Sequence, residues 1–292
     1  MDATRRVPTA PLGRSMPKRI GHAIGRGFVA ALLTGYAIVS VYPFLWMFSG
    51  AFKDNREILS NPLPWPKHPT LSTIVSVWNA MDIPNYLKNS AFISVVTVLL
   101  IVVIYPLAGY AFAVMRFPGR DVLFVLFLAI IFVPGIVILL PLVVLVTKLG
   151  LIATPWAVIL PAVNGAAPLA LVISRTYFRS VPPELRDAAK IDGASEWRTY
   201  WTIFFPLARP AVVTIALLNF VGIWNEYVLA KLLLGSERNQ VLPVGLQLLM
   251  STNVVNWNEV AAGAALVVLP VIVLFVVFQR YFINGIIGGV KA

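Results

Sequence analysis

Six long apolar stretches constrain the fold of this chain more than any other feature of its sequence. They cover residues 27–52, 91–115, 122–147, 149–174, 210–234 and 260–279. Each is close to the ~20 residues that an α-helix needs to cross the ~30 Å hydrocarbon core of a bilayer. Five carry no charge, and only 12% of the whole chain is charged against 59% apolar. This pattern predicts an all-α, polytopic membrane protein with six transmembrane helices, not a soluble enzyme.

The basic residues predict how these helices are oriented. With the N-terminus inside, the inner segments carry a net charge of +10 and the outer segments +1. The positive-inside rule then places both termini in the cytoplasm. We therefore expect a basic cytoplasmic segment over 1–26, a transmembrane domain over 27–283 and a cytoplasmic tail over 284–292. The positive charge is assigned to topology and to attraction toward anionic membrane lipid, not to nucleic acid.

Several kinds of chemistry are disfavoured by what the sequence lacks. There is no cysteine and there are only two distant histidines, so we expect no metal site. No segment matches the Gly-x-x-x-x-Gly-Lys-Ser/Thr loop that cradles nucleotide phosphates, which predicts that the chain does not bind ATP in that way. The only charged residues within the spans are Glu226 and Lys231. Glu226 lies about 24 Å beyond Pro210 along a helix, near the outer interface.

The positions of the acidic residues argue against two alternative classes of membrane protein. A secondary transporter driven by protons or ions needs acidic groups near the bilayer midplane, and the sequence offers none there. A membrane enzyme needs histidines or acids clustered at one interface, and the acids of 184–196 follow a helical pattern instead. Glu226 and Lys231 are therefore expected to extend toward the outer interface.

The inner loop 175–209 is predicted to hold two short helices. Pro182 and Pro183 precede Glu184, which is typical of a helix start. Gly193 is placed to end this helix, and Ser195 to cap the next. The second helix carries aromatic residues at a spacing of three to four, namely Trp197, Tyr200, Trp201 and Phe204. The small face of the first helix suits close docking of a partner, and the alternative is a pair of solvated surface helices.

The same loop resembles the EAA loop of ABC importer permeases. That pattern reads Glu-Ala-Ala, three residues, Gly, nine residues, then Ile-x-Leu-Pro. This chain has Asp187-Ala188-Ala189, then Gly193, Ile203 and Phe205-Pro206 at the same spacing. Two letters depart from the pattern, since Asp187 replaces Glu and Phe205 replaces Leu. Other strings are similar to the carbohydrate-uptake branch and its MalG-like subunit: Trp224-Asn225-Glu226-Tyr227, Leu242-Pro243-Val244-Gly245-Leu246 and Gln279-Arg280-Tyr281-Phe282.

The resemblance implies the type I ABC importer fold, in which the loop forms a coupling helix that docks on a separate cytoplasmic ATPase. The residues implied in ATPase coupling are Glu184, Asp187, Ala188, Ala189, Asp192, Gly193, Ile203, Phe205 and Pro206. The implied partners are a second, MalF-like permease subunit, two ABC ATPase subunits that bind the ATP and Mg, and an extracytoplasmic solute-binding protein. The chain itself needs no cofactor. The implied location is the cytoplasmic membrane of a prokaryote.

Import of a sugar is the function that the resemblance implies, and other solutes such as a glycerol phosphodiester or an oligopeptide are the alternatives. A sugar path needs amide groups and aromatic faces within the spans. The candidates are Asn164, Asn219, Trp224 and Asn225, and the alternative for each is a hydrogen bond between helices. The outer loops 53–90 and 235–259 are candidate contacts for the binding protein. The alternative for the first is an interfacial aromatic anchor with a turn-rich linker, and the alternative for the second is a solvated loop. In the second of these loops the candidates are Asn253, Asn256, Trp257 and Asn258.

Overall fold

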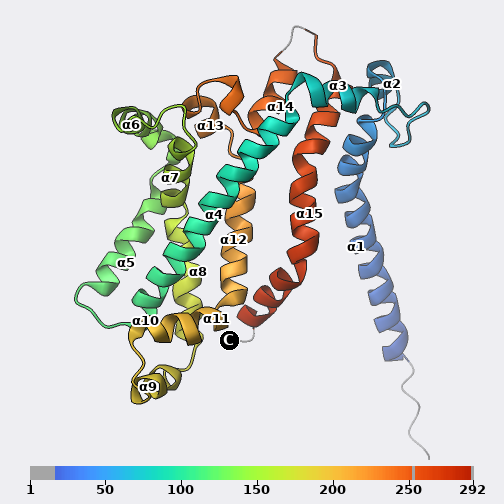
Figure 1. Cartoon of the computed structure of the whole chain (residues 1–292). Helices are drawn as coiled ribbons and strands as arrows, with labels where there is room; N and C mark the ends of the chain where they lie inside the picture. The colour runs from blue at the N-terminus through green and yellow to red at the C-terminus, as the bar shows by residue number, and fades with distance from the viewer. Residues whose placement is uncertain (1–16, 252–253, 291–292) are drawn as a thin grey trace, which may run out of the picture.

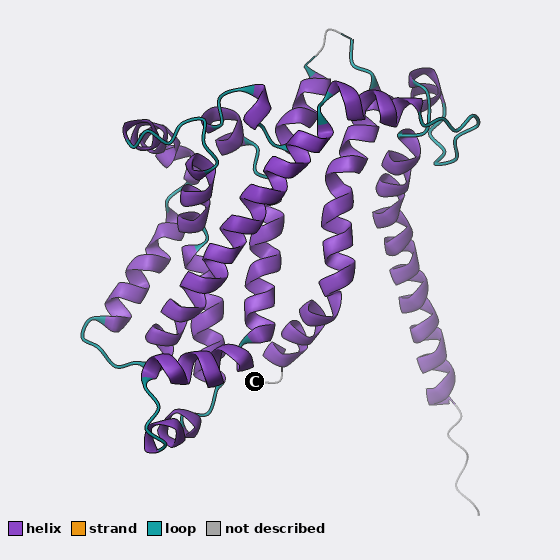
Figure 2. Cartoon of the chain, in the orientation of Figure 1, coloured by secondary structure: helices purple, strands orange, loops and turns teal. Residues whose placement is uncertain are grey.

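The protein is a bundle of helices running between two ends, as the computed structural model shows (Figure 1). The structure describes residues 17–251 and 254–290, with side chains over 25–251 and 254–279. Within these ranges the chain forms helices and loops but no strand (Figure 2). We call the two ends of the bundle the α9 end, which also holds the end of α15, and the α14 end, which holds α2, α3 and α14.

Three helices are long and apolar enough to cross a membrane alone. They are α1 (Pro17–Gly50), α4 (Ile83–Val114) and α15 (Trp257–Val290). Three bent pairs of helices are also apolar enough, and they bring the number of crossings to six when each pair counts as one span. The six crossings fit the predicted number, and the all-α membrane fold is confirmed. The outermost predicted boundaries differ, because α1 already begins at Pro17 and α15 continues to Val290.

The third apolar stretch is not the single helix that its length predicts. Helix α5 (Arg120–Ala129) continues into the short helix η1 (Ile130–Phe132) and stops. After a break at Val133 and Pro134, α6 (Gly135–Lys148) runs at 101° to it. Proline disfavours helical backbone at the residue before it, and Val133 is accordingly extended. In Figure 1, α6 therefore lies at the level of the α14 end, at the upper left edge of the bundle beside α7 and α13.

The fourth and fifth crossings are also displaced from their predicted boundaries. The fourth consists of α7 (Trp156–Gly165) and α8 (Ala167–Ser180), bent by 47°, instead of 149–174. Its late start follows a turn in which Gly150 and Ala153 have positive φ. The fifth predicted span, 210–234, is divided between α12 (Arg209–Trp224) and α13 (Val228–Leu233). Between them, the half-buried Glu226 accepts a hydrogen bond from the backbone N–H of Leu229 at 2.9 Å and so caps α13.

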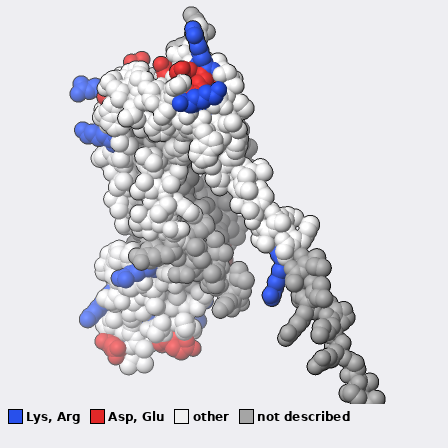
Figure 3. All heavy atoms as spheres, turned by 90° about the vertical axis from the view of Figure 1, so that its right-hand side faces the viewer, with Lys and Arg blue, Asp and Glu red and all other residues white. Residues whose placement is uncertain are grey.

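The centre of the bundle is α4, which packs against α7, α8 and α12. A close approach fixes α4 against α8. A Cβ added to Gly109 would lie 2.2 Å from Cβ of Ser174, so only glycine permits this contact. By contrast, α1 contacts the bundle through α15, and none of its apolar crossing segment is buried. Charged side chains gather toward the two ends of the molecule on the face in Figure 3.

Short helices and polar contacts close the α14 end. Helices α2 (Asn55–Ser60) and α3 (Ser72–Ala80) follow α1, and η3 (Glu237–Asn239) and α14 (Leu242–Met250) precede α15. Lys53 is fully buried here, and its ammonium donates to the backbone carbonyls of Asn61 (3.1 Å) and Leu63. These bonds hold the proline-rich segment that follows α2 against the end of α1.

Candidate functional site

The inner loop forms the two short helices that its sequence predicts. The first, α9 (Glu184–Ile191), ends in a Schellman motif. In that motif, the backbone N–H of Ala194 donates to the carbonyl of Ala189 at 2.9 Å, and the N–H of Gly193 donates to Lys190 at 3.0 Å. Gly193 has the positive φ of +75° that this termination needs. The hydroxyl of Ser195 then accepts from the N–H of Arg198 and caps α10 (Glu196–Thr199).

One carboxylate fastens α9 to the bundle. Glu196 accepts the guanidinium of Arg186 on two oxygens and the ammonium of Lys190 at 3.3 Å. It also accepts the Tyr110 hydroxyl, from the end of α4, at 2.8 Å. The Arg186 hydrogen bonds, supported by those from Tyr110 and Lys190, hold the pKa of Glu196 well below its ordinary value of 4.5. We call these four residues the Glu196 clamp.

An aromatic cluster lies directly behind the Glu196 clamp. The Tyr110 ring contacts Phe178 of α8 edge-on and packs against Tyr200 and Phe204, with centroids 4.9–5.8 Å away. Tyr200 and Phe204 bound η2 (Tyr200–Phe204), a π-helical turn that leads through α11 (Phe205–Leu207) into α12. The rings bury large apolar areas, so α4, α8 and the start of the fifth crossing form one packed unit. A displacement of α9 would therefore act on three crossings.

The outward surface of α9 is small, apolar and acidic. Ile191 is 87% exposed, an unusual setting for an isoleucine. Of the predicted coupling residues, several are exposed around it: Glu184, Asp187, Ala188, Asp192 and Gly193. Ala189 instead packs inward with 5% exposure, so it positions α9 and is not available to a partner. The anchoring residues of the second helix, Ile203, Phe205 and Pro206, are half-buried.

The predicted path residues do not form one group. Trp224 is buried, stacks on Phe220 and donates its indole N–H to the carbonyl of Val267 at 3.0 Å. It therefore joins α12 to α15, which is the alternative role that the sequence left open. Asn219 and Asn225 each donate to the carbonyl four residues earlier, at 2.8 Å, which leaves their amide oxygens unused by these bonds. Asn164 is exposed.

Two of the candidate contacts for the binding protein form hydrogen bonds to other residues of this chain. Asn256 pairs with Asn55 at 3.4 Å, and Asn258 donates to the Thr73 hydroxyl at 3.1 Å. Both amides thus tie the start of α15 to α2 and α3. Trp257 is 44% exposed and presents its ring at the surface. Asn253 lies outside the described residues.

Sequence reasoning missed the Glu196 clamp. Arg186 and Lys190 stand four residues apart on α9, the spacing that places two side chains on one helix face. Ser195 and Glu196 also mark a helix start, with an acid in the first turn. These signals place the charges on the correct helices. They do not show that α9 folds back so that Glu196 meets both cations and Tyr110, which is 86 residues away in sequence.

The chain matches the family model described as the binding-protein-dependent transport system inner membrane component over residues 104–288. It is 35% identical to the arabinooligosaccharides transport system permease protein AraQ of Halalkalibacterium halodurans, over 87% of this chain and 92% of that protein. It is 34% identical to the trehalose/maltose transport system permease protein MalG of Thermococcus litoralis, with the same coverage. The diacetylchitobiose uptake system permease protein NgcG of Streptomyces coelicolor is 30% identical, over 89% and 86%.

A solved structure shares the fold. It is a chain of a bacterial ABC transporter involved in the import of the acidic polysaccharide alginate. The TM-score is 0.78 at 23% identity, and the likeness covers 93% of this chain and 99% of that one.

Proposed function

Because the chain belongs to the family of binding-protein-dependent transport system inner membrane components, we propose that it is the permease subunit of an ATP-driven sugar importer. The solute crosses the cytoplasmic membrane, and both chain termini lie in the cytoplasm. ATP is bound and hydrolysed by separate ATPase subunits that dock on α9. A second, MalF-like permease subunit and an extracytoplasmic binding protein complete the importer.

The observation that carries this proposal is the connection from α9 to the crossings. The Glu196 clamp and the Tyr110 ring cluster attach α9 to α4, α8 and η2. A partner that pushes on the exposed Ile191 surface would move a helix that is fixed to three crossings. The sugar assignment is supported by the relatives, whose names specify arabino-oligosaccharides, trehalose, maltose and diacetylchitobiose.

An uptake assay tests the solute class. Cells with the gene deleted, and the same cells complemented with it, are offered labelled maltose, trehalose, arabino-oligosaccharide, galacto-oligosaccharide, diacetylchitobiose and a glycerol phosphodiester. We expect deletion to abolish uptake of one sugar and complementation to restore it. Loss of glycerol phosphodiester uptake alone, or no change for any sugar, would contradict the sugar assignment.

A pair of glycine substitutions tests the role of α9. Gly193→Val forces a β-branched residue into left-handed backbone, at a cost of about 1–3 kcal/mol of local strain. We expect sugar uptake and co-purification of the ATPase to fall while the amount of protein in the membrane stays normal. Gly150→Val is the matched control, because Gly150 also has a positive φ and open space around it but lies at the α14 end. Equal loss of uptake in both variants would remove the support for coupling through α9.

A further inference from the structure

A basic recess lies between α9 and the ends of the crossings. It has a volume of about 760 Å³, and the residues around it come from the ends of α4 and α8, the loop before α5 and the start of α5, the loop before α9, α9 itself, and η2. Five of these residues are basic and one, Asp187, is acidic; the basic ones are Arg116, Arg120, Arg179, Arg186 and Lys190. Such an excess of positive charge is costly unless an anion compensates it.

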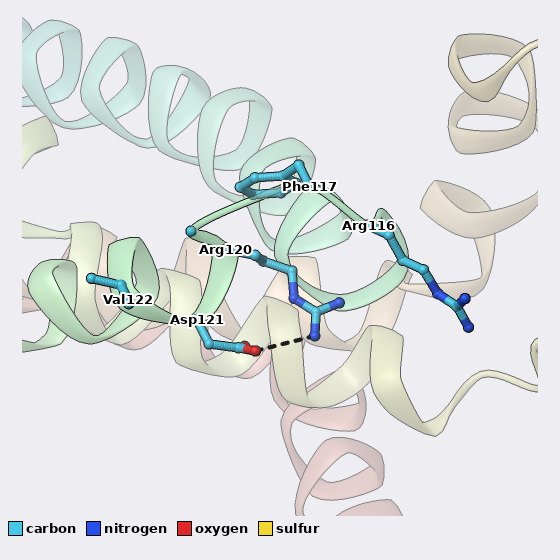
Figure 4. Close-up of a pocket in the computed structure, with 6 residues that line it drawn as sticks. Arg116, Phe117, Arg120, Asp121 and Val122 are labelled. Atoms are coloured by element: carbon cyan, nitrogen blue, oxygen red, sulfur yellow. Dashed lines mark hydrogen bonds and ion pairs between the residues drawn. The ribbon is translucent and has the colours of Figure 1, made fainter.

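The protein neutralises only some of these charges. Arg186 and Lys190 are paired with Glu196, and Arg120 is paired with Asp121. In the part of the chain that the structure describes, neither Arg116 nor Arg179 forms an ion pair. Figure 4 shows Arg120 directed at Asp121, whereas the Arg116 side chain extends away from that pair. Two exposed guanidinium groups thus remain available at the rim of the recess.

The surroundings of the recess indicate which kind of anionic molecule fits it. Arg116 and Arg120 also line an adjoining recess of about 410 Å³ that reaches Val122 on α5 (Figure 4). The outer surface of α5 is apolar there, with Val122 66% and Val125 61% exposed. Because α5 belongs to a membrane crossing, acyl chains cover this surface. A molecule with an anionic phosphate at one end and acyl chains at the other fits both recesses together.

We propose that this recess binds the phosphate of an anionic phospholipid at the membrane surface of the α9 end. Arg116 and Arg179 bind the phosphate, since the planar guanidinium matches phosphate oxygens in two-point contacts. The acyl chains lie along α5. Because Arg186, Asp187 and Lys190 of α9 form one side of the recess, the lipid lies directly against the helix proposed to meet the ATPase.

The test uses the full-length chain, purified in a neutral detergent, and needs neither transport nor partners. Binding of phosphatidylglycerol and of phosphatidylcholine with the same acyl chains is measured by native mass spectrometry. We expect phosphatidylglycerol to bind more tightly. Arg116→Gln with Arg179→Gln should weaken it about 25-fold, about fivefold for each basic residue removed. The charge-retaining pair, Arg116→Lys with Arg179→Lys, should bind more tightly than the Gln pair but more weakly than the wild type, because lysine keeps the charge and loses the two-point contact.

The matched control is Arg198→Gln with Arg209→Gln. These residues are exposed, lie at the same end of the molecule and do not line the recess. We expect this pair to weaken phosphatidylglycerol binding by less than about threefold, because neither residue lines the recess and exposed charges outside it are screened by salt. Equal weakening by the two Gln pairs, or unchanged binding in the Arg116 and Arg179 pair, would overturn the proposal.

Two further measurements distinguish the lipid from other molecules that could occupy the recess. Inorganic phosphate and glycerol 3-phosphate are added as competitors, and we expect neither to displace the lipid at equal concentration. Displacement would assign the recess to a free phosphate compound and overturn the lipid assignment. Co-purification of the ATPase is measured in the same variants. If it falls in the Arg116 and Arg179 pair while lipid binding is unchanged, the recess binds protein and the proposal is wrong.

Discussion

At the α9 end of the bundle the long-range polar contacts that hold α9 centre on one carboxylate, whereas the contacts at the α14 end use amide groups and backbone carbonyls. Glu196 receives Arg186, Lys190 and Tyr110 together. At the other end, Lys53 donates to carbonyls, and Asn55 binds the start of α15. The first arrangement concentrates several partners on a single group, and the second spreads them over independent bonds. Loss of the Glu196 carboxylate can thus detach α9, whereas loss of one side chain at the α14 end removes only the hydrogen bonds of that side chain.

The largest effect is expected when the shared carboxylate is removed. Glu196→Ala leaves two cations and the Tyr110 hydroxyl without their acceptor, and should cost about 2 kcal/mol of stability. Thermal unfolding in detergent measures the loss, and limited proteolysis at 182–195 shows whether α9 detaches. Asp187→Ala is the control, since Asp187 is exposed on the same helix, and should change stability by less than about 0.5 kcal/mol. Equal effects of the two would show that the clamp does not hold α9.

A smaller and more local effect is expected at Lys53. Lys53→Met keeps the length of the side chain but leaves the carbonyls of Asn61 and Leu63 without their buried donor, at a cost of about 1–2 kcal/mol. Hydrogen exchange should rise over residues 61–70 and stay unchanged over 182–195. Lys67→Met, at an exposed position of the same loop, is the control. Faster exchange at both ends of the bundle would contradict the independence of the two arrangements.

Asn55 should show a still smaller effect. Its carboxamide oxygen accepts the backbone N–H of Trp257 at 2.9 Å and so satisfies a free donor in the first turn of α15. Asn55→Ala should cost about 1 kcal/mol in thermal unfolding. Asn79→Ala, an exposed asparagine of α3, should change stability by less than about 0.5 kcal/mol. A neutral Asn55→Ala would mean that water replaces the lost acceptor.

The pH dependence sharpens the comparison further. A carboxylate with a lowered pKa stabilises the folded state above its ordinary pKa, and this contribution is lost as the pH falls through the lowered value. The stability difference between wild type and Glu196→Gln should therefore stay constant from about pH 8 to about pH 5 and shrink at lower pH. For Asn55→Ala the difference should stay flat throughout. Parallel curves would show that Glu196 is not the charged centre of the clamp.

The local features of α9 were predictable, because they depend on neighbouring residues. The end of the helix at Gly193 and the capping by Ser195 are both confirmed. The number of apolar crossings followed from length and hydropathy in the same way. The size of the break at Pro134 was not predicted, because an uncharged run of 26 residues fits one span, and only the structure shows α6 turned by 101°.

The candidate site was predictable in part for a similar reason. The docking residues could be placed on α9, but inward and outward positions could not be separated, so the burial of Ala189 came from the structure. The sequence pattern makes Trp224 and Asn258 candidate contacts for a solute or a binding protein, and in the structure their side chains donate hydrogen bonds within the chain. Polar residues in apolar spans serve packing and transport alike. The residues that pack against such a polar side chain across the bundle decide which role it has. Sequence spacing does not show which residues these are.

The contact between Gly109 and Ser174 limits how the bundle can move. Because no space for even a methyl group separates the two backbones, α4 and α8 cannot slide or rotate past each other without clashing. A movement that drives α4 toward α8 must therefore displace α8 as well. The two helices therefore behave as a single stiff arm, with Tyr110 and Phe178 at its tip beside α9. We therefore expect the pair to move as one unit, with conformational change at its ends.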